Sequence, residues 1–403
     1  MTPSDEAYVV DDGAPAIATA MWMGTAALMI LGIQPILLAA LVAEHRITDA
    51  MLGQLATVEV LAIALSSAVG ASFFRTGQMR PKAAVLAGLL AAVNVGCCFG
   101  DGQLSLFLLR GAAGLLEGAL LGCTIVLLTR ARAPDRINGV FLAAQTIPQA
   151  LAALALPIYL TPRWGSDAGF VILAAMAAVG VMLVRLLPQT GAPPAEAELA
   201  TMTDAPRKTA RWVWTPEIVF VMLALMLQTS GIGAAMEYLA ELAANHGFST
   251  QAAGFATSGN LITQVVGAFL VVGVAYRIPS AIALLGGVAA QFALSVAFPA
   301  MPNAGAYIVV SCLFGAFLLA LGPFQVAWLV RIEPTRRIAL LITPVTLIGW
   351  SIGPFVASFF VAPGHSDAAF WTAAALFTCA GLSYVAALLS RGRALPAPAA
   401  APS

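Results

Sequence analysis

The sequence has 403 residues, of which 60% are hydrophobic and only 9% are charged. Ordinary soluble domains have about 25% charged residues, so this chain has too few to cover a water-exposed surface. The formal net charge is zero, which argues against a nucleic-acid partner. These values predict an all-α protein for which the lipid bilayer is the main solvent.

Twelve apolar stretches are long enough to cross about 30 Å of hydrocarbon. In the first half of the chain they lie near 15–41, 51–74, 83–99, 104–129, 137–160 and 168–187. In the second half they lie near 216–242, 251–275, 280–300, 305–330, 338–361 and 368–390. We therefore expect a six-helix bundle over 1–187, a polar linker over 188–214, a second six-helix bundle over 215–391 and a short disordered tail over 392–403.

The basic residues predict how these spans are oriented. Sixteen of the 19 Lys and Arg residues fall in loops that alternate along the chain, together with the linker and the C-terminal segment. Cytoplasmic loops carry an excess of Lys and Arg, so both termini are predicted to be cytoplasmic.

The two halves also resemble each other at an offset of 200 residues, which favours an internal duplication. The matched positions are Gly122 with Gly322, Pro134 with Pro334 and Arg136 with Arg336.

The fourth span carries two charged residues, Arg110 and Glu117, in otherwise apolar sequence. A charge at the centre of a membrane helix costs about 2.5 kcal/mol or more on insertion scales, so it is rarely without a role. The two residues are seven positions apart and therefore project from one helix face. Next to them runs a row of glycines suited to close backbone packing, namely Gly114, Gly118 and Gly122.

Arg110 and Glu117 are expected to have different partners. They are separated by about 10 Å along the helix axis, which argues against a direct ion pair. Glu59 in the second span lies at a depth near that of Arg110, so these two residues can pair if their helices touch. One hypothesis is that Arg110 holds an anionic substrate or responds to a titrating glutamate, for which Glu59 is a candidate. The alternative is a purely structural pair that locks the N-terminal half.

Glu117 lies near the predicted midplane, and no cation is expected at its depth. Burial there favours the neutral, protonated carboxyl. One hypothesis is that Glu117 carries protons from one side of the membrane to the other. The alternative is a permanently protonated Glu117 that donates one hydrogen bond across the glycine row.

Other polar side chains within the spans are candidates for a substrate site near the midplane. Each one taken alone is more often an interhelical hydrogen bond, and Trp350 is more often a packing residue than a stacking platform. Glu237 and Glu241, near the outer end of the seventh span, are expected to be solvated interfacial charges, with a role at the outer mouth of the transport path as the alternative. The substrate-site candidates are Gln34, Gln145, Gln149, Gln228, Asn260, Gln264, Gln325 and Trp350.

Two local motifs, together with the six-plus-six layout, resemble the major facilitator superfamily of secondary transporters. Between spans two and three, Gly70, Arg75 and Gly77 match the Gly-x-x-x-Asp-Arg-x-Gly segment that is typical of that superfamily. Phe74 stands where that segment has its aspartate. In span eleven, Gly349, Gly353 and Pro354 form a Gly-x-x-x-Gly-Pro element. In drug/proton antiporters of the superfamily a similar element lies in span five, and span five of this sequence lacks it, which argues against a multidrug-efflux assignment. The resemblance implies a central cavity between the halves, lined chiefly by spans one, four, seven and ten.

No catalytic triad, nucleotide-binding loop or metal-ligand spacing is present, so we expect neither an enzyme nor a cofactor. The leading hypothesis is a proton-coupled symporter of a small organic anion, monomeric and located in a bacterial inner membrane. Its expected partners are the solute, protons and lipid. The alternatives are proton-driven efflux of amphipathic compounds and a non-transporting sensor or scaffold on the same fold.

Overall fold

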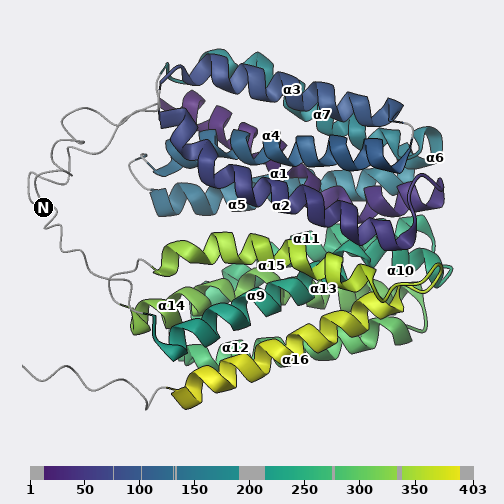
Figure 1. Ribbon diagram of the computed structural model, residues 1–403, viewed down its shortest axis with the longest axis vertical. Coiled ribbons are helices and arrows are strands. Elements are labelled where there is room, and N and C mark those ends of the chain that lie inside the picture. Colours follow the sequence, from purple (N-terminus) through teal and green to yellow (C-terminus); the bar gives the residue numbers. More distant parts are fainter. Residues whose placement is uncertain are drawn as a thin grey trace, which may run out of the picture.

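The computed structural model describes residues 13–75, 77–100, 102–129, 131, 134–189, 214–274, 277–333 and 338–390. Its helices form two bundles that lie side by side, the N-terminal one at the top of Figure 1 and the C-terminal one at the bottom. The first helix begins and the last helix ends at the same end of the molecule, on the left of Figure 1. Of the sequence predictions, residues 190–213 of the linker expected over 188–214, the tail over 392–403, Pro334 and Arg336 lie outside the described residues.

The N-terminal bundle begins with four long helices and ends with two interrupted ones. The elements are α1 (Gly13–Ala43), α2 (Asp49–Arg75), α3 (Met79–Phe99), α4 (Gln103–Thr129), α5 (Pro134–Ala155), a π-helical turn (Leu156–Leu160), α6 (Thr161–Trp164), α7 (Asp167–Leu183) and a 3₁₀ turn (Val184–Leu186).

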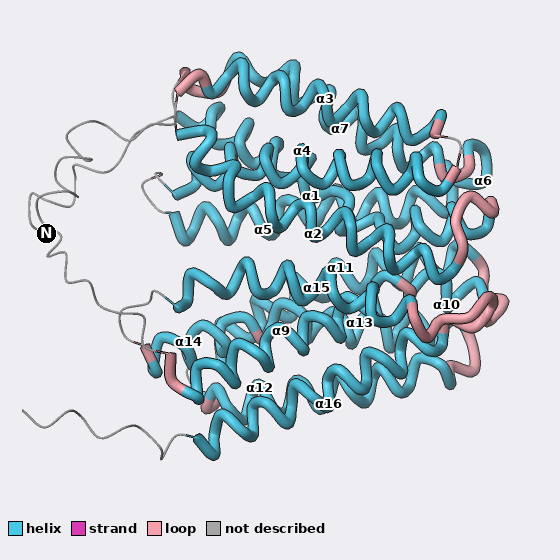
Figure 2. The backbone as a smooth tube through the Cα atoms, in the orientation of Figure 1, coloured by secondary structure: helices cyan, strands magenta, loops and turns pink. Residues whose placement is uncertain are grey.

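The C-terminal bundle repeats this plan with more interruptions. The elements are α9 (Pro216–Glu237), α10 (Leu239–Asn245), α11 (Thr250–Val274), α12 (Ser280–Ala297), a 3₁₀ turn (Phe298–Ala300), α13 (Ala304–Ala320), α14 (Gly322–Ile332), a second 3₁₀ turn (Ile338–Leu341), α15 (Ile342–Ser358) and α16 (Asp367–Ser390). The tube in Figure 2 shows that short loops join these helices at the two ends of the bundles.

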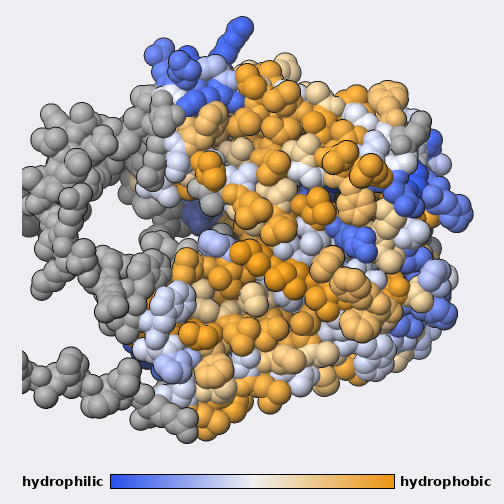
Figure 3. All heavy atoms as spheres, in the orientation of Figure 1, coloured by the Kyte–Doolittle hydropathy of each residue, from blue (hydrophilic) through white to orange (hydrophobic). Residues whose placement is uncertain are grey.

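Eleven helical segments among the described residues are long and apolar enough to cross a bilayer, and the shorter apolar helix Pro344–Ser358 supplies a twelfth span. The expected count of twelve agrees with this architecture, and the chain is an integral, multi-pass membrane protein. Figure 3 shows mainly apolar side chains across the middle of the molecule and hydrophilic ones gathered toward its ends. Such a belt is what lipid chains solvate.

Two of the expected spans are divided into two helices in the structure. The span expected over 216–242 ends at Glu237, and α10 follows as a separate short helix after Tyr238. The span expected over 305–330 divides at Leu321, between α13 and α14. Pro323 follows the break, and proline lacks the N–H that an uninterrupted α-helix would need there.

The glycine row of α4 is where the backbones of α2 and α4 approach each other. A Cβ atom added at Gly114 would overlap the Glu59 carbonyl oxygen, and one at Gly118 would overlap the Ile63 carbonyl oxygen. One added at Gly122 would overlap the backbone of Gly70. Only glycine therefore permits this helix separation.

The C-terminal bundle repeats the same contact between α11 and α13. A Cβ atom added at Gly315 would overlap the carbonyl oxygen of Asn260. Glu59 corresponds to Asn260, and Gly114 to Gly315, at an offset of 201, one residue from the offset of 200 found in the sequence. The internal similarity therefore extends to matching helix contacts in the two halves.

The bundles contact each other through α2 with α15 and through α5 with α11. The Tyr238 hydroxyl accepts a hydrogen bond from Gly53 N at 3.2 Å, and Thr57 Oγ1 donates to the Ser351 carbonyl at 2.7 Å. These bonds lie toward the end of the molecule that carries α10. Among the described helices, α4, α13 and α14 have no substantial contact with the opposite bundle.

Candidate functional site

A buried polar cluster lies inside the N-terminal bundle and is centred on Arg110, which is 1% exposed. Its guanidinium donates to Glu59 through Nε to Oε2 at 3.1 Å and through Nη2 to Oε1. Nη1 donates to Asn94 Oδ1 at 2.8 Å. The contact between Glu59 and Arg110 is the one that their similar depth suggested.

Further helices complete the enclosure of this ion pair. Gln34 Nε2 in α1 donates to Glu59 Oε2 at 2.9 Å. The ring of Phe170 in α7 lies 5.6 Å from the Arg110 guanidinium carbon, within range of a cation–π interaction. Side chains from α1, α2, α3, α4 and α7 thus converge on one ion pair. The Arg110 guanidinium is held within the bundle, between helices of its own half.

Glu117 lies closer to Arg110 than we expected. Its Oε1 is 3.9 Å from Arg110 Nη2, so the expectation that these two residues are too far apart to interact was wrong. The separation of about 10 Å applies to the helix axis, whereas the Arg110 side chain is long and the Glu117 Cα–Cβ bond tilts toward the helix N-terminus. Together these two side chains close most of the axial distance.

The Glu117 carboxyl is nevertheless without a hydrogen bond. The residue is 0% exposed, and neither of its carboxyl oxygens has a hydrogen-bond partner in the part of the chain that the structure describes. Two carboxyls therefore share one guanidinium away from water. With a proton on Glu117 the cluster is neutral, and without it the cluster carries one uncompensated negative charge. Because an uncompensated buried charge is costly, this arrangement favours protonated Glu117.

The C-terminal bundle contains an uncharged counterpart of this cluster. Gln228 Nε2 donates to Gln291 Oε1 at 2.8 Å, and Gln228 Oε1 accepts from Gln325 Nε2 at 3.2 Å and from the Tyr384 hydroxyl at 3.0 Å. We had not predicted Gln291 or Tyr384, although an amide within an apolar span is a recognisable signal. These residues connect α9, α12, α14 and α16.

The remaining predicted amides are dispersed rather than gathered at one site. Asn260 Nδ2 donates to the Ser311 carbonyl at 2.7 Å, and Gln264 Nε2 donates to Asn260 Oδ1 at 2.9 Å. Gln149 Nε2 donates to the Leu28 carbonyl at 2.7 Å. Gln145 is partly buried, and its Oε1 has no partner among the described residues. Most of these groups join neighbouring helices or neighbouring turns.

Glu237 and Glu241 are 1% and 4% exposed, so the expectation that they are solvated was wrong. Trp350 Nε1 donates to Glu237 Oε1 at 3.2 Å, which occupies the polar edge of the indole. Burial here comes from helices that are distant in sequence, since α9 packs against α15 and α10 packs against α1. The sequence near these two residues carries no sign of either contact.

The glycines of the two motifs lie at close helix contacts or turns. Cβ atoms added at Gly349 and Gly353 would overlap α9, and the Pro354 carbonyl lies against Gly53 of the opposite bundle. The glycines preceding α3 differ: Gly70 packs against α4, whereas Gly77 has a φ of +85° in the turn. The side chain of Arg75 lies outside the described residues.

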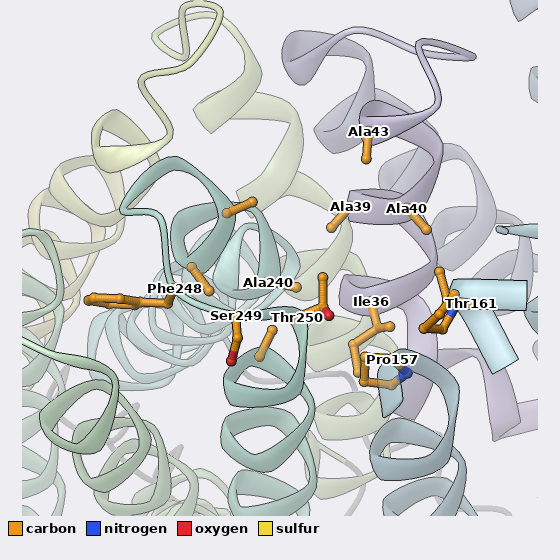
Figure 4. Close-up of a pocket in the computed structure, with 14 residues that line it drawn as sticks. Ile36, Ala39, Ala40, Ala43, Pro157, Thr161, Ala240, Phe248, Ser249 and Thr250 are labelled. Carbon is orange, nitrogen blue, oxygen red and sulfur yellow. The ribbon is translucent and has the colours of Figure 1, made fainter. Parts of the chain in front are cut away.

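A cavity of about 330 Å³ lies between the bundles at the α10 end (Figure 4). Its wall combines Ile36 of α1 and Pro157 of the N-terminal bundle with Ala240, Phe248 and Thr250 of the C-terminal bundle. The lining is almost entirely apolar and excludes the charged cluster around Arg110. No group of three or more His, Cys, Asp or Glu residues in the described ranges could hold a metal ion.

No protein-family model matches the sequence, and no curated protein is significantly similar to it. Several solved structures, however, are similar in fold. A bacterial homologue of the human lysosomal transporter Spinster, in an inward-facing and occupied conformation, has a TM-score of 0.70 at 14% identity over 94% of this chain and 98% of that one. The nucleoside transporter NupG has a TM-score of 0.68 at 13% identity over 94% and 98% of the two chains.

The xylose transporter XylE from E. coli, in a partially occluded inward-open conformation, has a TM-score of 0.67 at 14% identity over 91% of this chain and 98% of that one. All three similar proteins are transporters by description. At these identities the similarity establishes the shared fold across nearly the whole chain.

Proposed function

Because the chain has the fold of the major facilitator superfamily, we propose that it is a proton-coupled secondary transporter that works by rocking its two bundles. The observation that carries this proposal is Glu117, a fully buried carboxyl that has no hydrogen-bond partner among the described residues and whose Oε1 lies 3.9 Å from Arg110 Nη2. Such a group binds and releases a proton at a position where the change in charge alters an ion pair.

The proposed coupling step is a change of partner by Arg110. When Glu117 loses its proton, its charge attracts the Arg110 guanidinium and weakens the bond to Glu59. Glu59 belongs to α2, which packs tightly on α4 at Gly114 and also contacts α15 of the opposite bundle. A small shift of α2 relative to α4 is thereby transmitted to the interface between the bundles.

We propose that the solute binds between the two bundles. A small organic anion taken up by symport would require Arg110 to leave Glu59, because the guanidinium is enclosed by its own bundle. The apolar cavity at the interface favours a second candidate, proton-driven efflux of an amphipathic compound. We also propose that the protein is a monomer in a bacterial inner membrane with both termini cytoplasmic, an orientation supported by the alternating distribution of Lys and Arg among the loops.

The proposal is tested with purified protein in liposomes, after a thermal-shift screen of metabolite pools has identified a ligand. Glu117→Gln keeps the shape of the side chain and removes the titration. We expect it to abolish accumulation driven by a pH gradient while substrate counterflow continues. Glu44→Gln, in the loop between α1 and α2, is the matched control and should accumulate substrate normally. Undiminished accumulation by the Glu117 variant would show that the carboxyl has only a structural role.

The anion hypothesis has its own test in Arg110→Lys. Lysine keeps the charge and lacks the planar fork that binds a carboxylate with two hydrogen bonds. A severalfold higher KM for an anionic substrate, with unchanged KM for uncharged ligands, would support an anion site at Arg110. An unchanged KM for every anion would exclude it.

A further inference from the structure

Glu237, the last residue of α9, is a buried carboxyl that the proposed coupling step at Glu117 does not use. The residue is 1% exposed, and its Oε1 accepts a hydrogen bond from Trp350 Nε1 at 3.2 Å. Its other oxygen, Oε2, is buried without a hydrogen-bond partner among the described residues. Within that part of the chain, a neutral indole N–H is therefore the only donor to a carboxyl that lies away from water.

The titratable groups around Glu237 include no cation paired with it in the described ranges. The packed helices α1 and α15 contain no titratable side chain, whereas α2 contributes Asp49 in its first turn and α10 contributes Glu241. α16 begins at Asp367, which is bonded to the His246 imidazole at 3.0 Å. No Lys, Arg or His side chain in the described part of the chain forms an ion pair with Glu237. An ionised Glu237 would therefore be an uncompensated buried charge, which favours the protonated carboxyl.

The residue that follows Glu237 is bonded to the opposite bundle. The Tyr238 hydroxyl donates to the Asp49 carbonyl at 3.2 Å and accepts from Gly53 N at 3.2 Å. Tyr238 is 0% exposed, and the first turns of α2 form part of its enclosure. The C-terminal end of α9 is thus held against α2 of the N-terminal bundle.

The residue that follows Trp350 is bonded to the same helix. The Ser351 carbonyl accepts from Thr57 Oγ1 at 2.7 Å, and a Cβ atom added at Gly53 would overlap the Pro354 carbonyl oxygen. Residues 49–57 of α2 therefore contact the chain immediately after each of the two residues that form the carboxyl–indole bond. The Glu237 site is closed on this side by the opposite bundle.

We propose that Glu237 is a second proton-binding site, which holds its proton while residues 49–57 of α2 close the site and releases the proton to water when the bundles separate at the α10 end. The inference rests on the rocking motion proposed above, but not on Glu117. Glu117 lies inside the N-terminal bundle beside Arg110, whereas Glu237 lies in the C-terminal bundle at the interface. Glu237 then has the role at the mouth of the transport path that the sequence analysis gave as its alternative.

The direction of the pH effect follows from burial. A solvated glutamate is ionised above about pH 4.3, so Glu237 gives up its proton once water reaches it at neutral pH. The closed state keeps the proton, because the ionised carboxyl would be buried without a cation. The closed state therefore binds one proton more than the separated state, and its population increases as the pH falls. One linked proton changes the ratio of closed to separated molecules by up to about tenfold per pH unit.

The first measurement follows conformation without substrate or gradient. Spin labels at Arg163 and His365, exposed residues at the α10 end of the two bundles, report the distance between the bundles by double electron–electron resonance. The labels are attached in a background in which the three cysteines that are not fully buried are replaced by alanine, namely Cys98, Cys312 and Cys379. Measurements run from pH 5 to pH 8.5 in lipid nanodiscs.

We expect the closed fraction of the parent protein to increase as the pH falls. Glu237→Gln keeps an acceptor for Trp350 Nε1 but cannot titrate, so this variant should close without responding to pH. Glu241→Gln is the matched control, a second buried carboxyl one turn further along the chain, and it should keep the parent response. Asp49→Asn and His246→Asn should keep it as well, which excludes titration of these two neighbours.

The second measurement detects the proton itself by infrared spectroscopy. A protonated carboxyl has a C=O stretching band that a carboxylate lacks. At pH 6, where solvated glutamates are ionised, the spectrum of the parent minus that of Glu237→Gln should contain one such band. Absence of the band would show that Glu237 is ionised in the closed state and would overturn the proposal.

The distance measurement can also overturn the proposal. It fails if the closed fraction of the parent does not depend on pH, or if Glu237→Gln responds to pH as the parent does. Glu117→Gln should keep the pH-dependent closure while it loses proton-driven accumulation. Failure at Glu237 is therefore distinguishable from failure of the function proposed for Glu117.

Discussion

Removal of the Glu59 carboxylate gives a quantitative test of the charged cluster. In the described part of the chain, Arg110 has two carboxyls within 4 Å: Glu59, which is hydrogen-bonded to it, and Glu117, which lies at 3.9 Å and has no hydrogen-bond partner there. In Glu59→Gln the Arg110 charge loses its partner, and we expect Glu117 to release its proton and replace Glu59. In Glu117→Gln the pair between Glu59 and Arg110 stays intact. Only the double variant leaves Arg110 without any carboxylate.

The expected changes in the free energy of unfolding follow from which carboxylates remain beside Arg110 in each variant. Glu117→Gln should change the free energy of unfolding by less than about 0.5 kcal/mol, because no hydrogen bond of the carboxyl is lost. Glu59→Gln should cost about 1–2 kcal/mol, since Glu117 compensates for part of the lost charge-assisted bonding. The double variant should lose about 3–5 kcal/mol, the cost of removing one partner of a buried ion pair. The resulting coupling energy is about 2 kcal/mol, near the upper part of the range for residues in contact.

Unfolding in mixed detergent micelles, followed by tryptophan fluorescence, measures all four proteins of this cycle. Glu59→Gln combined with Glu237→Gln is the matched control, because Glu237 belongs to the other bundle, and its effects should add within about 0.5 kcal/mol. Additive effects of the Glu59 and Glu117 variants would refute the reasoning. They would show that Glu117 does not act as the reserve counter-ion of Arg110.

Two further changes test the helix contacts. Gly114→Val and Gly315→Val should each destabilise the protein by about 1–3 kcal/mol through overpacking, measured in the same unfolding assay. Gly139→Val is the control, because a Cβ atom added there meets no atom within 4 Å, and it should destabilise the protein much less. Thr57→Val removes the 2.7 Å bond to the Ser351 carbonyl and should shift the bundles toward separation by about 0.5–1.5 kcal/mol. The shift is detectable by double electron–electron resonance as a longer mean distance between spin labels at Arg163 and His365, exposed residues in the N-terminal and C-terminal bundles. An unchanged distance distribution would show that this bond does not hold the interface closed.

The sequence by itself determined the spans, their division into two halves and the presence of a charged cluster. These features are local: a bilayer requires each spanning segment to satisfy its backbone hydrogen bonds internally and to be apolar over its whole length. A charge in such a segment needs a partner inside the protein, which is why Arg110 and Glu59 were recognisable before their contact was seen. The glycine row of α4 was recognisable for a similar reason, since its spacing exposes backbone along one face.

Only the tertiary structure decided which groups meet. The approach of Glu117 to Arg110 depends on side-chain direction, which separation along a helix axis does not capture. Gln291 and Tyr384 join Gln228 because α12 and α16 pack beside α9, and nothing local to those residues specifies that packing. The burial of Glu237 and Glu241 arises in the same way, from helices that are far apart in the chain. Contacts of this kind depend on how preformed helices pack together, so they are properties of the assembled bundles rather than of any one segment.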